Sequence, residues 1–195
     1  MRAVRPMRAG PAPEDAMNST ENAICEALLD LMEEQPLRTI KVTKLAECAG
    51  ISRSTFYLYF DSIDGVVECI EDRFFKDAPK EIAAPYAFIN EREWKHYFSV
   101  MSKLLREYAI LTGPNGDPAF AARLEERDRM SIDSSSSQQF RDYHSTELEV
   151  INAFIHGGKM YATRWWAEHE DEISVNDFSE IMAKLLKACS RIAQQ

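Results

Sequence analysis

The sequence lacks the features of a membrane or secreted protein. Its 195 residues contain no apolar run of about 18 residues, the length needed to span a bilayer. The first 18 residues carry arginines, prolines and a glycine but no apolar core of the kind that signal peptides have. We therefore expect a disordered leader over residues 1–18, no membrane association and a cytoplasmic location.

Cysteine and histidine are also scarce. The four cysteines are Cys25, Cys48, Cys69 and Cys189, which lie far apart and form no C-x-x-C pair, and the four histidines are scattered. These spacings exclude the common zinc patterns and favour buried, reduced thiols, with a thiol redox sensor as the alternative. No nucleophile–base pair or glycine-rich phosphate loop is visible either. We expect no metal, no cofactor and no enzymatic activity, and an enzyme remains the third possible class.

The net charge is −9, which does not favour binding to a polyanion. Residues 19–64 contain four basic and eight acidic residues, a balance of −4. Three of the four bases fall within residues 38–44 and the fourth is Arg53, whereas most of the acids precede them. The local electrostatic potential matters more than the total charge, so these four basic side chains still allow a contact with nucleic acid.

The apolar residues recur with helical period along almost the whole chain. The pattern predicts helices over residues 19–34, 42–49, 63–76, 91–111, 119–130, 140–168 and 175–193. Ser19 and Thr20 are the expected N-caps of the first helix, and Pro36 stops it. Residues 112–118 (TGPNGDP) predict a turn and residues 131–137 (SIDSSSS) a loop. Strand-like alternation is missing, so the fold class is all-α.

The segment 41–60, KVTKLAECAGISRSTFYLYF, is the most informative part of the chain. A short helix ends at Gly50, as expected of a left-handed C-cap, and Ser52 is placed to cap a second short helix. The second helix has a polar face, with Phe56 and Phe60 on the opposite side. This is the layout of a helix-turn-helix that packs one side on its own domain and presents the other to the DNA major groove.

This segment resembles the DNA-binding domain of TetR-family transcriptional regulators. The residues that match the family pattern are Ala46, Ala49, Gly50, Ser52, Thr55, Phe56, Tyr57 and Phe60, and the resemblance extends from Ser19 to about Phe75. It implies a three-helix helix-turn-helix DNA-binding domain over residues 19–64, followed by a helical effector-binding and dimerisation domain over residues 65–195.

The resemblance also implies which side chains contact DNA. They are Lys41, Thr43, Lys44, Ser52, Arg53, Ser54, Thr55, Tyr57 and Tyr59. Arg53 and Ser54 are expected at base edges and Thr55 and Tyr57 at phosphates. The chain departs from the family in two places. Ile63 stands where a phosphate-contacting lysine is usual, and Lys41 stands where a Thr or Ser N-cap is usual.

In the TetR family the C-terminal domain binds a small molecule and dimerises through its last two long helices. The dimer seam expected here comprises Phe178, Ile181, Met182, Leu185, Leu186 and Ile192, with Gly157 and Gly158 allowing close helix approach. The residues expected to line an effector site are Trp94, Phe98, Met101, Phe120, Phe154, His156 and Trp165, although ordinary core packing also explains them.

The function that follows is that of a ligand-responsive transcriptional regulator, a repressor that binds a palindromic double-stranded operator as a homodimer and responds to an unknown small molecule. The alternative is a TetR-like protein-interaction module or coactivator with weak DNA binding. The acidic balance of residues 19–64 and Ile63 favour that alternative.

Overall fold

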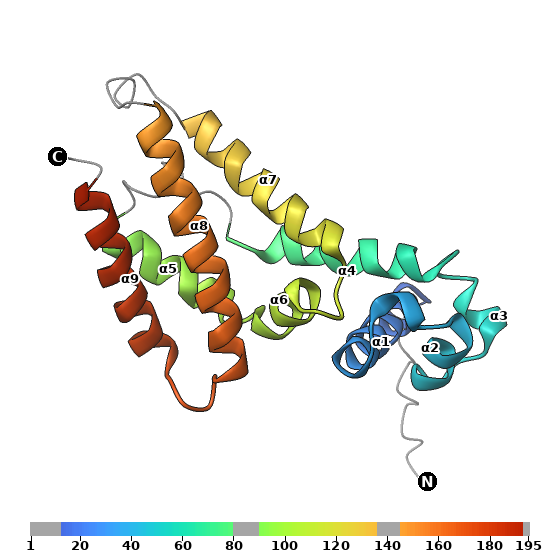
Figure 1. Cartoon of the computed structure of the whole chain (residues 1–195). Coiled ribbons are helices and arrows are strands. Elements are labelled where there is room, and N and C mark those ends of the chain that lie inside the picture. The colour runs from blue at the N-terminus through green and yellow to red at the C-terminus, as the bar shows by residue number, and fades with distance from the viewer. Residues whose placement is uncertain (1–12, 80–89, 136–144, 193–195) are drawn as a thin grey trace, which may run out of the picture. The chain divides into compact units, whose positions relative to one another are not determined.

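The computed structural model describes residues 13–79, 90–135 and 145–192, which form only helices and turns (Figure 1). The helices are α1 (Pro13–Glu34), the 3-10 turn η1 (Leu37–Thr39), α2 (Val42–Cys48), α3 (Arg53–Phe56), α4 (Ile63–Asp77), α5 (Glu91–Met101), α6 (Leu105–Thr112), α7 (Pro118–Ser135), α8 (Ser145–Glu168) and α9 (Val175–Ile192). The predicted all-α class is confirmed. The chain separates into two compact units, Met1–Ile70 and Glu71–Gln195, with α4 running through the boundary.

The N-terminal unit is built on α1. This helix begins at Pro13, not at the expected Ser19–Thr20 caps, and ends at Glu34 as predicted. Proline is well suited to a first helical position because its missing N–H has no partner to lose there. Residues 1–12 of the expected leader lie outside the described residues. The core of this unit comprises Ile24, Leu28, Leu31, Met32, Leu45, Ala46, Phe56, Val66, Val67 and Ile70, all buried.

Two predictions about the second unit are wrong. The helix expected over residues 91–111 is broken at Ser102 and gives α5 and α6, and the Ser102 hydroxyl donates to the Ser99 carbonyl at 2.9 Å. Such a local side-chain bond competes with the helical ladder, which a pattern of apolar residues does not reveal. The loop expected from Ser131 is instead helical to Ser135, because polar composition is a weak guide where a helix is already formed.

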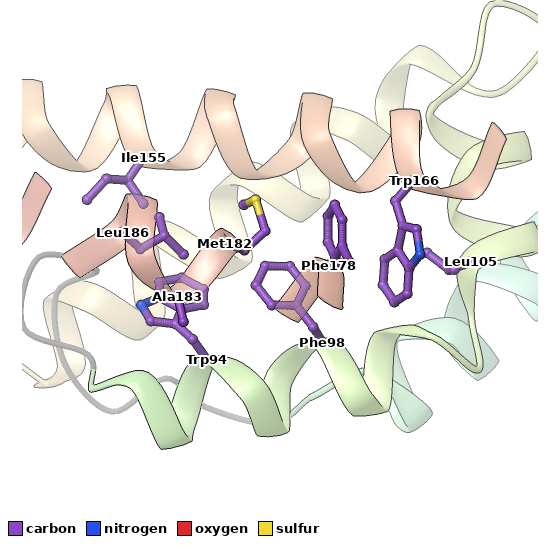
Figure 2. Close-up of a cluster of buried hydrophobic side chains, with 9 residues drawn as sticks. All are labelled: Trp94, Phe98, Leu105, Ile155, Trp166, Phe178, Met182, Ala183 and Leu186. Atoms are coloured by element: carbon purple, nitrogen blue, oxygen red, sulfur yellow. The ribbon is translucent and has the colours of Figure 1, made fainter. Parts of the chain in front are cut away.

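The core of the second unit lies between α5, α8 and α9. Figure 2 shows its side chains pointing into one another from these helices and from α6: Trp94, Phe98, Leu105, Ile155, Trp166, Phe178, Met182, Ala183 and Leu186. The Trp166 and Phe178 rings stack with centroids 4.3 Å apart, and Phe98 meets Phe178 edge-on at 5.2 Å. Three members of the expected dimer seam, Phe178, Met182 and Leu186, are therefore core residues. Their spacing of four places them on the face of α9 that turns to α5.

A second contact joins the C-terminal half of α4 to α7. Phe120 packs edge-on against Phe74 with ring centroids 5.3 Å apart. The Arg123 guanidinium pairs with the buried Glu71 carboxylate. Arg127 donates to the Pro79 carbonyl at 3.0 Å, just beyond the end of α4. A buried carboxylate needs such a partner, so α4 and α7 are held together by charge as well as by apolar packing.

Candidate nucleic-acid interface

The turn between α2 and α3 has the backbone geometry that the sequence predicts. Gly50 has φ of 68°, in the left-handed region that favours glycine. The Ile51 N–H donates to the Ala46 carbonyl at 2.9 Å and the Gly50 N–H donates to the Glu47 carbonyl at 3.1 Å. These two bonds form a Schellman motif, which ends α2 and sets the direction in which the chain enters α3.

Ser52 caps α3 as expected. Its hydroxyl oxygen accepts the Thr55 backbone N–H at 3.0 Å and lies 2.8 Å from the Thr55 hydroxyl and 2.7 Å from the Ser54 hydroxyl. This cluster satisfies an N–H that the first turn of the helix would otherwise leave unpaired. It also fixes the start of the helix from which the candidate contacts project.

Helical bonding continues past the last residue of α3. The Tyr57 N–H donates to the Arg53 carbonyl at 3.2 Å and the Phe60 N–H donates to the Phe56 carbonyl at 3.0 Å. Phe56 is completely buried and anchors the segment, while Phe60 is half-buried with its ring centroid 6.1 Å from that of Phe56. The face opposite these two rings is therefore presented outward as a unit.

That outward face carries most of the predicted contact residues. Arg53 and Ser54 are exposed, and Tyr57 retains 48% of its accessible surface. Thr55 and Tyr59 are half-buried at its margins, and Ser52 is exposed at its start. The structure thus brings the predicted residues from Ser52 to Tyr59 together on one short helical segment.

The remaining predicted residues lie at the start of α2. Lys41, Thr43 and Lys44 are all exposed, and Lys41 is the N-cap residue with no side-chain capping bond, as its chemistry requires. The Lys44 ammonium lies 3.9 Å from the exposed Glu47 carboxylate, a surface pair that is weak and easily exchanged for another anion. The helix N-terminus and these two lysines suit a phosphate.

Leu58 is a candidate contact that the sequence reasoning missed. Its side chain is 82% exposed, although leucine is normally placed in a core. It lies two residues after Phe56 and two before Phe60, about 200° around the helix from the buried Phe56 ring, so it points away from the core. The signal was present in the sequence, since the period set by Phe56 and Phe60 already turns Leu58 away from the core. An apolar side chain here suits a thymine methyl group.

Removing the cap tests how far this geometry depends on one hydroxyl. We expect Ser52→Ala to lower the free energy of unfolding of the N-terminal unit by about 1 kcal/mol, the usual cost of losing an N-cap oxygen. Chemical denaturation followed by circular dichroism measures it. Ser19→Ala, an exposed serine within α1, is the control and should change stability by less than half as much. Equal losses for the two variants would mean that the Ser52 cap contributes nothing particular.

The predicted effector-site residues do not form one group. Trp94 and Phe98 lie in the core between α5, α8 and α9, while Phe120 lies between α4 and α7. Met101 is buried near the end of α5, and His156 is half-buried on α8. Phe154 and Trp165 instead lie on an exposed face of α8.

Within residues 13–79, 90–135 and 145–192, no group of three or more His, Cys, Asp or Glu side chains could hold a metal ion. Nor does any helix in this part of the chain combine the length and apolarity needed to cross a bilayer.

Comparison with known proteins agrees with the N-terminal geometry. Residues 24–70 match the family model of bacterial regulatory proteins of the tetR family. The HTH-type transcriptional regulator EthR of Mycobacterium tuberculosis is 45% identical over 58 residues, which make up 30% of this chain and 27% of EthR. The chain therefore matches just over a quarter of the length of this relative.

Solved structures are similar over nearly the whole chain. A tetR-family transcriptional regulator from Streptomyces coelicolor has a TM-score of 0.59 at 15% identity, covering 90% of this chain and 82% of its own. The fatty acid degradation regulator FadR from Bacillus halodurans has a TM-score of 0.59 at 14% identity, covering 92% and 97%. At such identities the likeness shows the fold.

A capped helix-turn-helix with an outward polar face, followed by a unit made of helices, defines a protein of the helix-turn-helix class. Within that class, residues 24–70 match the model of the tetR family, and the fold of the chain is similar to that of solved tetR-family regulators.

Proposed function

We propose that the protein is a DNA-binding transcriptional regulator that acts as a homodimer on a palindromic operator. The observation that carries this proposal is the outward face of Arg53, Ser54, Tyr57 and Leu58, which a capped and anchored helical segment holds clear of the core. Such a face fits the major groove of DNA. The family match over the same residues supports it.

The contacts divide into two kinds. Arg53 and Ser54 read base edges, and Leu58 adds an apolar contact. Lys41, Thr43, Lys44, Ser52, Thr55, Tyr57 and Tyr59 contact the phosphate backbone or fix the register. Phosphate contacts set affinity for any sequence, whereas base contacts set specificity. Residues 19–64 have only four basic side chains, and Ile63 at the start of α4 is half-buried and uncharged. The affinity for DNA should therefore depend more on contacts with nucleobases, and less on contacts with phosphates, than is usual.

Selection from a random DNA library, followed by fluorescence polarisation, tests the proposal. We expect an inverted repeat whose half-sites are about one helical turn, or a multiple of it, apart. Lys44→Gln should weaken binding to all sequences alike, and Lys103→Gln, an exposed lysine between α5 and α6, is the control for loss of one charge. Failure to enrich any sequence at low salt would contradict the proposal.

The homodimer is supported by an apolar face that a single chain leaves open. On α8 it comprises Val150, Phe154, Tyr161 and Trp165, and on α9 Ile181 and Leu185, all exposed. The two helices contact each other, so their exposed residues can form one continuous surface. Contiguous apolar surface of this kind marks an interface. Gly157 and Gly158 lie on the same face, where a Cβ atom would meet nothing within 4 Å, so a partner helix has room to approach closely.

We propose that the effector binds within the second unit, whose buried apolar residues include Trp94, Phe98, Met101 and Phe120 and whose helix α8 carries the half-buried His156. Phe154 and Trp165 belong to the dimer face in this proposal.

An effector that displaced α7 would move α4 through the Glu71–Arg123 pair and the Arg127 contact. Because α4 continues into the N-terminal unit, that movement would lower operator affinity, as expected of a repressor. A coupling free energy of about 1–3 kcal/mol suffices. Such a protein works in the cytoplasm.

The alternative is a TetR-like protein-interaction module or coactivator that binds DNA weakly and acts by binding another protein. The acidic balance of residues 19–64 and the absence of a lysine at position 63 favour it. In that case the random library yields no preferred sequence, while the dimer still forms. For the regulator, we propose domain boundaries at residues 19–64 for DNA contact and 65–195 for effector binding and dimerisation.

A further inference from the structure

Two cysteines that are far apart in the sequence meet inside the N-terminal unit. Cys25 lies on α1 and Cys69 on α4, and their sulfur atoms are 4.0 Å apart. Cys25 is 3% exposed, and Cys69 is partly exposed. The other two cysteines are on different elements, Cys48 on α2 and Cys189 on α9. The pair therefore joins the two helices that precede and follow the helix-turn-helix.

A hydrogen-bonded chain orders the two thiols. The Cys25 S–H donates to the Cys69 sulfur, and the Cys69 S–H donates to the Glu21 carboxylate oxygen at 3.4 Å. Glu21 lies one helical turn before Cys25 on α1. The Cys69 hydrogen is thus directed to Glu21, and the Cys69 lone pairs are directed to Cys25. Cys69 is the partly exposed residue of the two and so the one that an oxidant from solvent can reach, and the sulfur of the buried Cys25 lies 4.0 Å from its sulfur.

We propose that Cys25 and Cys69 are a redox-active pair that peroxide converts into a disulfide linking α1 to α4. Cys69 gives its proton to the Glu21 carboxylate, and the thiolate so formed attacks hydrogen peroxide: an S–O bond forms, the O–O bond breaks, and the departing hydroxide takes the proton from Glu21, leaving a sulfenic acid and one water. The Cys25 sulfur then attacks the Cys69 sulfur, the S–O bond breaks, and hydroxide leaves with the Cys25 proton as a second water. Two thiols lose two electrons in total, and peroxide is reduced to two waters.

A disulfide between Cys25 and Cys69 would close a loop of the chain around the DNA-contacting helices. The segment between Cys25 and Cys69 contains α2 and α3, the whole helix-turn-helix. A bonded pair of sulfurs is about 2.05 Å apart, so the two atoms must approach by about 2 Å through side-chain rotation or a shift of α1 against α4. Buried neighbours such as Ile24, Leu28 and Ile70 are closely packed and transmit that shift. We expect oxidation to lower operator affinity, an effect that depends on the proposed function.

The test uses the full chain with Cys48→Ser and Cys189→Ala, which keeps both cysteines of the pair and so leaves their packing intact. The protein is treated with hydrogen peroxide, alkylated, digested with trypsin and analysed by mass spectrometry. Cys25 lies in the tryptic peptide 9–38 and Cys69 in the peptide 54–73. The proposal requires these two peptides to be joined. Recovery of both as alkylated peptides, or oxidation of Cys69 to a sulfinic acid without a link, would overturn it.

Two further measurements distinguish disulfide formation from its expected effect on operator affinity. In a Cys25→Ala variant, Cys69 should stop at the sulfenic or sulfinic acid, and a dimedone adduct at peptide 54–73 reports the former. Operator affinity of the double-substituted protein should fall about fivefold or more on oxidation and recover with dithiothreitol. A linked protein with unchanged affinity would overturn the regulatory effect. If the reduced protein binds no DNA, the proposed function fails, and the peptide mapping still decides the thiol chemistry.

Discussion

Replacing Phe154 and Leu185 together by aspartate is expected to make the protein monomeric and to weaken operator binding by about 100-fold or more. Phe154 on α8 is 71% exposed and Leu185 on α9 is 57% exposed, so neither contributes much to the core of its own chain. In a two-fold dimer each substitution occurs twice, so the interface would bury four carboxylates without partners. The free-energy penalty of burying them would exceed the free energy that the apolar interface contributes to dimerisation.

The effect on DNA follows from linkage of the two N-terminal units. A single helix-turn-helix covers one half-site, and a dimer gains the second half-site at the high effective concentration set by the first. The monomer loses that gain although every DNA-contacting side chain is intact. Analytical ultracentrifugation measures the mass, and polarisation with the selected operator measures the affinity.

The matched control is His96→Asp, which replaces an exposed ring on α5 by a carboxylate away from the dimer face. It should remain dimeric and bind DNA as the parent does. A double variant that sediments as a dimer would show that the open face of α8 and α9 is not the interface. If the parent protein is itself a monomer at micromolar concentration, the open face of α8 and α9 is likewise not a dimer interface.

The N-terminal unit could be predicted from the sequence because its signals are local. The left-handed conformation at Gly50 and the cap at Ser52 each depend on a few consecutive residues with distinct chemistry. Phe56 and Phe60 set a helical period that places the outward face. The start of α1 was missed because the Ser19 and Thr20 caps offered an equally good local signal inside a longer helix.

The second unit was harder to predict, since its helices have more than one apolar face. On α9 the residues Phe178 and Met182 face the core, whereas Ile181 and Leu185 are open. Helical period separates these two stripes but does not say which one the same chain covers. That choice depends on the position of α5, which is distant in sequence. The Cys25–Cys69 contact could not be predicted either, because it depends on how α1 packs against α4, which is distant in sequence.

Arg53→Gln is expected to lower operator affinity by about 10- to 100-fold and to remove the preference for one base pair in each half-site. Arg53 is the first residue of α3, exposed, and positioned by the Ser52 cap. An arginine in this position can donate two hydrogen bonds to guanine O6 and N7, a contact that discriminates by about 1–3 kcal/mol. Glutamine keeps a polar side chain of similar reach, but it cannot make the same paired donation.

The expected change is one of specificity as well as affinity, and this separates base reading from simple charge loss. Selection with the Arg53→Gln protein should recover the same half-site spacing with one guanine position relaxed. Arg92→Gln, an exposed arginine on α5 in the second unit, removes the same charge and should leave both the affinity and the selected sequence unchanged. If Arg53→Gln selects the original sequence with only a shallower salt dependence, Arg53 contacts phosphate. Base reading would then depend on Ser54 and Leu58, whose outward placement is the same.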